Sequence, residues 1–97
     1  MRQFEWDLQK AEQNLLKHGI SFDTAASALL GLGVTQPSVR AAENRFMTFC
    51  EIEGRLVTVI WTPRLNVIRI VSARAARKNE QAYYRQSVGR SAAARRH

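Results

Sequence analysis

Cysteine is nearly absent from the sequence, and no long apolar segment occurs in it. Cys50 is the one cysteine among 97 residues, which excludes an internal disulfide bond and a zinc site built from cysteines. No apolar run approaches the roughly 20 residues of a membrane-spanning helix. The first residues, MRQFEWD, include acids and lack the apolar centre of a signal peptide. These absences predict a cytoplasmic protein that does not associate with a membrane.

The length and composition indicate one folded domain. The chain is 45% apolar and 24% charged, as is usual for globular proteins. The residues after Gly89 are rich in alanine, serine and arginine, so we predict a single domain over residues 1–88 and a basic, flexible tail over 89–97. A chain this short buries a modest core, and its stability can therefore depend on a partner.

Acidic residues are scarce relative to basic ones. Eight acids face fifteen lysines and arginines, which gives a formal charge of +7, and twelve of the basic residues are arginine. Because the guanidinium group is a planar fork that matches phosphate, this bias favours a polyanionic partner. Solubility and a basic tail are the alternative explanation, although the tail contains only Arg90, Arg95 and Arg96.

The first half of the chain predicts a short strand and two helices. Residues 2–6 read as the strand, and Asp7 is a good N-cap for a helix that ends near His18. Gly19 supplies the left-handed conformation that terminates helices. Ser21 can cap a second helix, whose apolar positions recur at helical spacing; they are Phe22, Ala25, Ala26, Leu29 and Leu30. Glycine and proline interrupt this pattern, and we expect an irregular connection over residues 34–44.

The second half changes to the two-residue period of strands. Three strands are expected, with a tight Glu53-Gly54 turn between the first two and a turn over residues 63–66 before the third; they are Arg45–Ile52, Arg55–Thr62 and Val67–Ser72. The middle strand is apolar on both faces, which predicts a central position in the sheet. Residues 73–88 read as a helix. The expected fold is α+β, with the two N-terminal helices packed on one antiparallel sheet and a C-terminal helix following it.

An ordered set of short segments then resembles a known family. The segments are FEWD at residues 4–7, KA at 10–11, Asn14, KHGISF at 17–22, GR at 54–55, VIWTPR at 59–64, IRIVSAR at 68–74, Glu80 and Tyr83. Together they are similar to the BrnT toxins over about residues 4–84. The chain departs from that family after the second predicted helix, where BrnT toxins carry an acidic stretch and residues 31–40 contain no acid.

The resemblance implies a fold, an activity and partners. The fold would be RelE-like, and the activity would be metal-free cleavage of RNA, with no cofactor. The partner would be a BrnA-like antitoxin, similar to ribbon-helix-helix proteins. The toxin–antitoxin pair would bind operator DNA and repress its own operon.

RNA cleavage by this route requires acid–base groups and cations rather than a nucleophilic side chain. The 2′-hydroxyl of RNA is the nucleophile, so the protein supplies a base, an acid and positive charge near the phosphate. The histidines lie far apart in the sequence and the acids are scattered, which offers no metal-ligand cluster. His18 has a suitable ordinary pKa for proton transfer; its alternative role is to interact with the carbonyl end of its helix. Lys17 is a possible phosphate contact or a solvated charge.

The arginines make the stronger case for a site. Arg69 interrupts an apolar strand, so it should lie on the open face of the sheet, where Arg45 and Arg64 can converge on it. Arg74 and Arg77 are expected at the start of the final helix, where an anion such as Glu80 or a phosphate would offset their charge. Surface salt bridges are the alternative for each arginine. We therefore predict catalytic roles for His18, Arg64, Arg69 and Arg74, and RNA binding by Lys17, Arg45, Arg77 and Tyr84.

The aromatic residues and Cys50 are assigned mainly to the core. Core packing is the expected role of Trp6, Trp61, Phe46 and Phe49. Tyr83 and Tyr84 point to different faces of the last helix, so one should pack on the sheet while the other is available to a base. Cys50 reads as a small buried hydrophobic residue. Two other functions stay open: a nucleic-acid-binding module without catalysis, and a module that only docks a protein partner.

Overall fold

The protein has an α+β fold, and its described residues form three helices and a five-stranded mixed sheet. The computed structural model describes residues 3–38 and 44–94. The elements in chain order are β1 Gln3–Glu5, α1 Leu8–His18, α2 Phe22–Leu29, β2 Gly33–Pro37, β3 Phe46–Ile52, β4 Arg55–Arg64, β5 Val67–Ala75 and α3 Lys78–Ala94. Three predicted features fall partly outside the described residues: the start of the first strand, the middle of the 34–44 connection and the end of the tail. In the described part of the chain, no helix is both long enough and apolar enough to cross a membrane.

The ends of the two N-terminal helices lie where capping chemistry predicts them. The Asp7 side chain accepts a hydrogen bond from the Lys10 backbone N–H at 3.0 Å, and Gly19 has φ 70° at the end of α1. The Ser21 hydroxyl accepts from the Thr24 N–H at 3.1 Å and caps α2. The apolar stripe predicted for α2 is wrong at its end, because α2 stops at Leu29 and Leu30 is 63% exposed.

The sheet has the strand order β1-β5-β4-β3-β2. Its centre is β4, as the two apolar faces of that strand predict. The four strands from β2 to β5 are antiparallel, but β1 pairs in parallel with β5. The sheet is therefore mixed rather than purely antiparallel, because α1 and α2 carry the chain from β1 back across the sheet.

The prediction of an irregular connection over residues 34–44 is wrong for its first part. Residues Gly33–Pro37 form β2, which pairs along its whole length with β3. At Gly33 a Cβ atom would lie 2.9 Å from the Thr48 Cγ2 atom, so glycine permits this close approach. As an edge strand, β2 needs pairing on one side only and tolerates Pro37 at its end.

The predicted boundary between the third meander strand and the last helix is also wrong. β5 continues to Ala75, opposite Val57, and α3 begins at Lys78. Cross-strand pairing outweighs the helix propensity of the alanines here. The helix extends to Ala94, past Gly89, while the flexibility expected of residues 89–97 stays a prediction.

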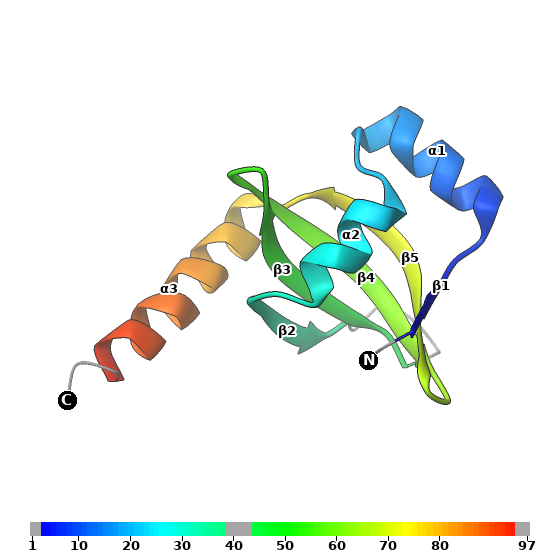
Figure 1. The fold of residues 1–97 in the computed structure, drawn as a ribbon. Coiled ribbons are helices and arrows are strands. Elements are labelled where there is room, and N and C mark those ends of the chain that lie inside the picture. Colours follow the sequence, from blue (N-terminus) through cyan, green and yellow to red (C-terminus); the bar gives the residue numbers. More distant parts are fainter. Residues whose placement is uncertain (1–2, 39–43, 95–97) are drawn as a thin grey trace.

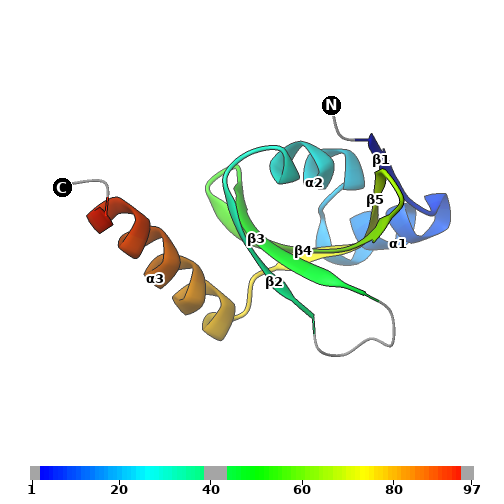
Figure 2. The same cartoon turned by 90° about the horizontal axis from the view of Figure 1, so that it is seen from below.

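Helix α2 lies over one face of the sheet, α1 packs beside β5, and α3 begins beside β3 (Figure 1). The core between α2 and the sheet includes Phe22, Ala25, Val59 and Ile70, all nearly inaccessible to solvent. In two perpendicular views α3 extends away from the sheet after its first turns (Figures 1 and 2). Most of the sheet face opposite to α2 is therefore left without a helix.

Helix α1 packs against β5 at a position that β1 does not reach. β1 pairs only with Val67, Ile68 and Arg69. Beyond them, the buried Asn14 amide donates to the Ala73 carbonyl at 2.9 Å and accepts from the Ala73 N–H at 3.2 Å. This side chain thus satisfies the backbone groups that a longer neighbouring strand would otherwise bind.

Candidate functional site

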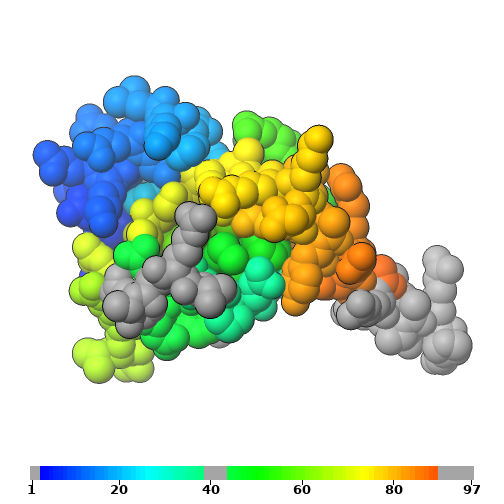
Figure 3. All heavy atoms as spheres, turned by 180° about the vertical axis from the view of Figure 1, so that it is seen from behind, coloured from blue at the N-terminus to red at the C-terminus, as the bar shows by residue number. Residues whose placement is uncertain are grey.

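The sheet face opposite to α2 carries Arg69 and the buried Thr62 at one end. Thr62 of β4 pairs with Arg69 of β5. Arg45 directly precedes β3, whose first residue, Phe46, pairs with Trp61. The Thr62 hydroxyl donates to the Asn44 carbonyl at 2.8 Å and holds this end together. Because paired residues share a face, Arg69 lies on the same face as Thr62, and β5 and the start of α3 lie at the surface in the view of Figure 3.

Arg64 extends this row toward the β4–β5 turn. It lies two residues after Thr62, on the same face, and pairs with Val67. Its side chain is exposed. The predicted convergence of Arg64 on the face of Arg69 agrees with this register, whereas Arg45 lies just before β3, outside the paired residues; we call Arg45, Arg64 and Arg69 the arginine row.

Arg69 has one acidic neighbour, Glu5 of the adjacent strand β1. The Arg69 Nη1 atom and the Glu5 Oε2 atom are 3.5 Å apart, and both side chains are partly exposed. An exposed pair at this distance stabilises a fold by little. The remaining guanidinium donors of Arg69 stay available to a phosphate.

Arg74 is placed differently from the prediction. It belongs to β5 and not to a helix, and it pairs with the buried Glu80 of α3. Its Nη1 and Nη2 atoms donate to the two carboxylate oxygens at 2.8 and 2.9 Å. Arg74 lies five residues beyond Arg69, roughly 16 Å along the strand. The structure therefore does not bring Arg74 into the arginine row.

Glu80 connects three elements through four hydrogen bonds. Besides Arg74, its donors are the Thr58 hydroxyl at 2.9 Å and the Arg77 backbone N–H at 2.8 Å. These donors, with Arg74 foremost, lower the pKa of Glu80 from 4.5 to about 2 although burial opposes the shift. A carboxylate that binds the N–H three residues earlier is half of a capping box. Glu80 is thus the expected anion beside Arg74, whereas at Arg77 it binds the backbone N–H and not the guanidinium.

His18 and Lys17 lie at the C-terminal end of α1. The helix follows β1, which is parallel to β5, and Asn14 contacts Ala73, so α1 runs in the direction of β5 (Figure 1). His18 is one turn beyond Asn14 and partly buried, while Lys17 is exposed. The predicted catalytic set is therefore divided between the two ends of β5, with His18 and Arg74 at one end and Arg64 and Arg69 at the other.

A cleft lies between the β3–β4 hairpin and α3. It has a volume of about 430 Å³ and is lined by Glu51, Gly54, Arg55, Leu56, Ala75, Ala76, Gln81, Tyr84 and Arg85; we call it the hairpin cleft. Burial, and then the nearby charge of Glu51, raise the pKa of Tyr84, so its phenol stays protonated. Tyr83 instead packs its ring edge against Phe49, with centroids 6.0 Å apart. The prediction that one tyrosine packs on the sheet is confirmed.

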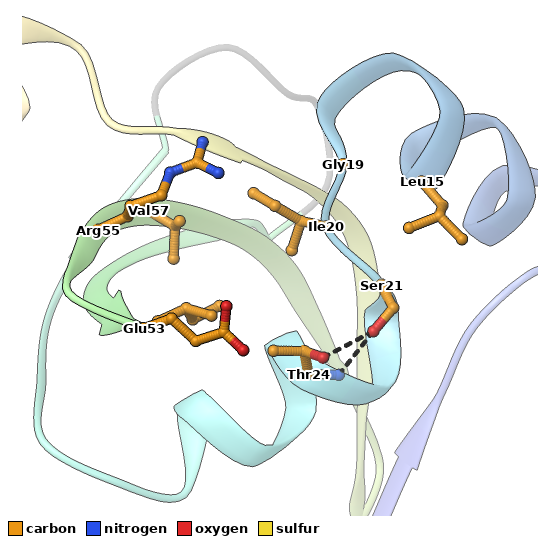
Figure 4. A pocket seen from close by; sticks show the side chains of 9 residues that line it. Leu15, Gly19, Ile20, Ser21, Thr24, Glu53, Arg55 and Val57 are labelled. Atoms are coloured by element: carbon orange, nitrogen blue, oxygen red, sulfur yellow. Dashed lines mark hydrogen bonds between the residues drawn. The ribbon is translucent and has the colours of Figure 1, made fainter.

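A smaller pocket of about 180 Å³ lies on the helix side of the same hairpin. Leu15 and Ile20 line it from α1 and the α1–α2 connection, and Glu53, Arg55 and Val57 line it from the hairpin (Figure 4). Arg55 borders both this pocket and the hairpin cleft. Neither Arg55 nor Arg85 was predicted as a site residue, because only the packing of α3 beside the hairpin reveals their shared cleft.

The core assignments of the sequence analysis agree with the structure. Cys50 is buried, and burial raises the pKa of its thiol to about 11, which makes it a poor nucleophile. Trp6 packs edge-on against Phe22, and Phe46 stacks on Trp61. Within residues 3–38 and 44–94, no three His, Cys, Asp or Glu side chains are grouped to hold a metal ion.

These features define a small α+β protein whose sheet presents a basic surface. The family model described as "Ribonuclease toxin, BrnT, of type II toxin-antitoxin system" matches residues 6–80. The chain belongs to this BrnT family of ribonuclease toxins, as the sequence segments indicate.

One solved structure supports the same assignment. The chain is similar to the ribonuclease toxin BrnT of Brucella abortus, with a TM-score of 0.67 and 26% sequence identity. The match covers 80% of this chain and 100% of that chain. None of the curated proteins matches the chain significantly. The α+β fold expected from the sequence is confirmed.

Proposed function

We propose that the chain cleaves RNA on the sheet face opposite to α2, by metal-independent acid–base chemistry centred on the arginine row. The observation that carries this proposal is the pairing of Arg69 with Thr62, with Arg64 two residues after Thr62 on the same face and Arg45 directly before β3. Guanidinium groups fixed on rigid strands are suited to a phosphate whose charge increases in the transition state.

The proposed reaction is an intramolecular transesterification of the RNA. The 2′-oxygen attacks the neighbouring phosphorus and loses its proton to a base, while the bond from phosphorus to the 5′-oxygen breaks and that oxygen gains a proton. The products are a 2′,3′-cyclic phosphate and a 5′-hydroxyl. Arg64 and Arg69 would bind the non-bridging oxygens, where negative charge develops.

The other predicted residues would contact RNA further along the chain. Arg74 is held on Glu80 and lies roughly 16 Å from Arg69 along β5. Arg77 follows it on the exposed connection to α3, and Lys17 and His18 lie toward the same end of β5. We assign these residues to substrate binding, with proton transfer by His18 kept as a testable role.

A chelator experiment tests the proposed chemistry. Purified protein incubated with single-stranded RNA in EDTA should cleave it and leave cyclic phosphate ends. Cleavage that disappears in EDTA and returns with magnesium would reject the metal-independent mechanism. Absence of cleavage in every condition would favour the alternative of a nucleic-acid-binding module without catalysis.

The antitoxin is proposed to be a BrnA-like ribbon-helix-helix protein that joins the toxin in a 2:2 or similar complex on operator DNA. The family description names a type II toxin–antitoxin system, and a +7 charge favours fast association with an acidic partner. Helix α1 also exposes Leu8, Leu15 and Leu16, apolar side chains that a partner would cover. Expression of the chain alone should inhibit growth of cells, and co-expression of the adjacent gene product should restore it.

A further inference from the structure

The hairpin cleft combines an aromatic ring and a cation on one helix face with a second cation on the opposite wall. Gln81, Tyr84 and Arg85 are spaced i, i+3, i+4, so they lie side by side on α3. The Gln81 Nε2 atom donates to the Ala76 carbonyl at 3.0 Å and fixes this face against the end of β5. The opposite wall is the hairpin, with Arg55 at its rim.

The size and the lining of the cleft suit one unit of a single-stranded nucleic acid. Its volume of about 430 Å³ lies within the range of ligand sites. A partly buried tyrosine offers a ring of fixed orientation on which a base can stack, and neighbouring arginines attract the backbone. The Glu51 carboxylate lines the same cleft and can accept hydrogen bonds from the amino group of a base.

The position of the cleft relative to the arginine row is the second argument. Ala75 lines the cleft and Arg69 belongs to the row, and both are residues of β5. Ala75 lies six positions after Arg69, which corresponds to roughly 20 Å along the strand. The exposed Arg77 directly follows Ala76 of the cleft lining, so a further positive charge lies next to the cleft. An RNA strand that is bound at the arginine row and extends along β5 would therefore reach the cleft. The nucleotides in the cleft would be ones that do not flank the scissile bond.

We propose that the hairpin cleft is a nucleotide-binding subsite of the RNA substrate, in which Tyr84 stacks on a base while Arg85 and Arg55 bind the backbone. This inference rests on the proposed function, because it assigns a substrate subsite to the same reaction. The subsite contributes affinity for RNA that is longer than the scissile dinucleotide, and it takes no part in bond cleavage.

The test uses the full chain and a fluorescent, single-stranded 2′-O-methyl RNA of twelve nucleotides, which binds but cannot be cleaved. Tyr84→Leu should weaken binding by roughly 5- to 100-fold, as loss of one stacked base does. Tyr84→Phe, which keeps the ring, should retain most of the affinity. Arg85→Ala should weaken binding more than Lys78→Ala, which removes the same charge from an α3 residue outside the lining. Thermal unfolding of each variant checks that it is folded.

Kinetics on cleavable RNA separate this subsite from the catalytic face. For a long substrate the Tyr84→Leu and Arg85→Ala variants should raise KM with kcat within twofold of the parent protein, and for a dinucleotide they should change neither. If the parent protein cleaves RNA and both variants bind the twelve-nucleotide probe as it does, the subsite is wrong and the proposed function stands. Loss of antitoxin binding with unchanged RNA binding would instead assign the cleft to the antitoxin. A parent protein that neither binds nor cleaves RNA overturns both proposals.

Discussion

The Asn14 side chain binds both backbone groups of Ala73, 59 positions later in the sequence. It also donates to the Ile20 carbonyl at 3.0 Å, just after the end of α1. One amide therefore joins the first helix, the loop after it and the strand that carries Arg69 and Arg74.

Replacement of Asn14 by alanine should destabilise the fold severely. The change leaves buried backbone groups of Ala73 and Ile20 without partners, each at a cost of about 1–3 kcal/mol. We expect the free energy of unfolding to fall by roughly 2–4 kcal/mol, measured by urea denaturation. Gln13→Ala on the exposed side of the same helix is the control and should change it by less than about 0.5 kcal/mol. Equal effects of the two variants would contradict the role given to Asn14.

Glu80 should make the stability of the protein depend on pH in the acidic range. Its pKa is lowered from 4.5 to about 2 by folding, so its stabilising contribution is complete above about pH 4.5 and is lost as the pH falls toward 2. At neutral pH, Glu80→Gln should lower the free energy of unfolding by on the order of 3 kcal/mol. The difference between the variant and the parent protein should shrink steadily between pH 4.5 and 2.5. A difference that does not depend on pH would show that the charge of Glu80 is not what stabilises α3.

Arg69 should matter for catalysis more than for stability. Arg69→Ala should reduce the rate of RNA cleavage by roughly 10- to 100-fold, because a donor to the developing charge is lost, while unfolding changes by at most about 1 kcal/mol. Glu5→Gln removes the same ion pair but keeps the guanidinium, and it should leave cleavage active. Similar loss of cleavage in both variants would mean that the ion pair, and not a phosphate contact, is the role of Arg69.

Arg74→Ala gives a different pattern from Arg69→Ala. It leaves the buried carboxylate of Glu80 without its strongest donor, so the folded protein itself should be lost. For this reason, reduced toxicity of an Arg74 variant in cells does not by itself indicate catalysis.

The β4–β5 turn contains Leu65, whose replacement should increase the stability of the protein. Leu65 has φ 56° and is fully exposed, so it adopts a left-handed conformation that costs a side chain about 1 kcal/mol. Leu65→Gly should raise the free energy of unfolding by roughly 0.5–1 kcal/mol. Leu32→Gly, at another exposed leucine that lacks a positive φ, should not raise it. Thermal and urea unfolding of both variants measure the difference.

The sequence predicted the elements whose signals are local. Asp7, Gly19 and Ser21 end or begin helices through contacts within a few residues, and Glu53-Gly54 makes a two-residue turn with positive φ at both positions. The face of Arg69 followed from alternation along its strand, which is also a local property.

The errors concern features that depend on distant residues. β2 exists because β3 offers a free edge, and β5 extends to Ala75 because β4 pairs with it. Glu80 was expected to offset the charge of Arg74, but a bridge from a strand to a helix was not predicted, since Arg74 was expected in the same helix as Glu80. In the sequence, Asn14 is marked only by its place among the segments that resemble the family. No sequence pattern indicates that its side chain binds the backbone of a strand 59 positions away.

The parallel pairing of β1 with β5 also fixes an order of assembly. Residues 3–5 have no strand to join until residues 67–69 are available, and contacts between such distant segments form slowly. Glu5 reaches Arg69, and Asn14 reaches Ala73, only after the whole meander has been made. During translation, the edge of the sheet that β1 and α1 complete can therefore form only after β5 has emerged.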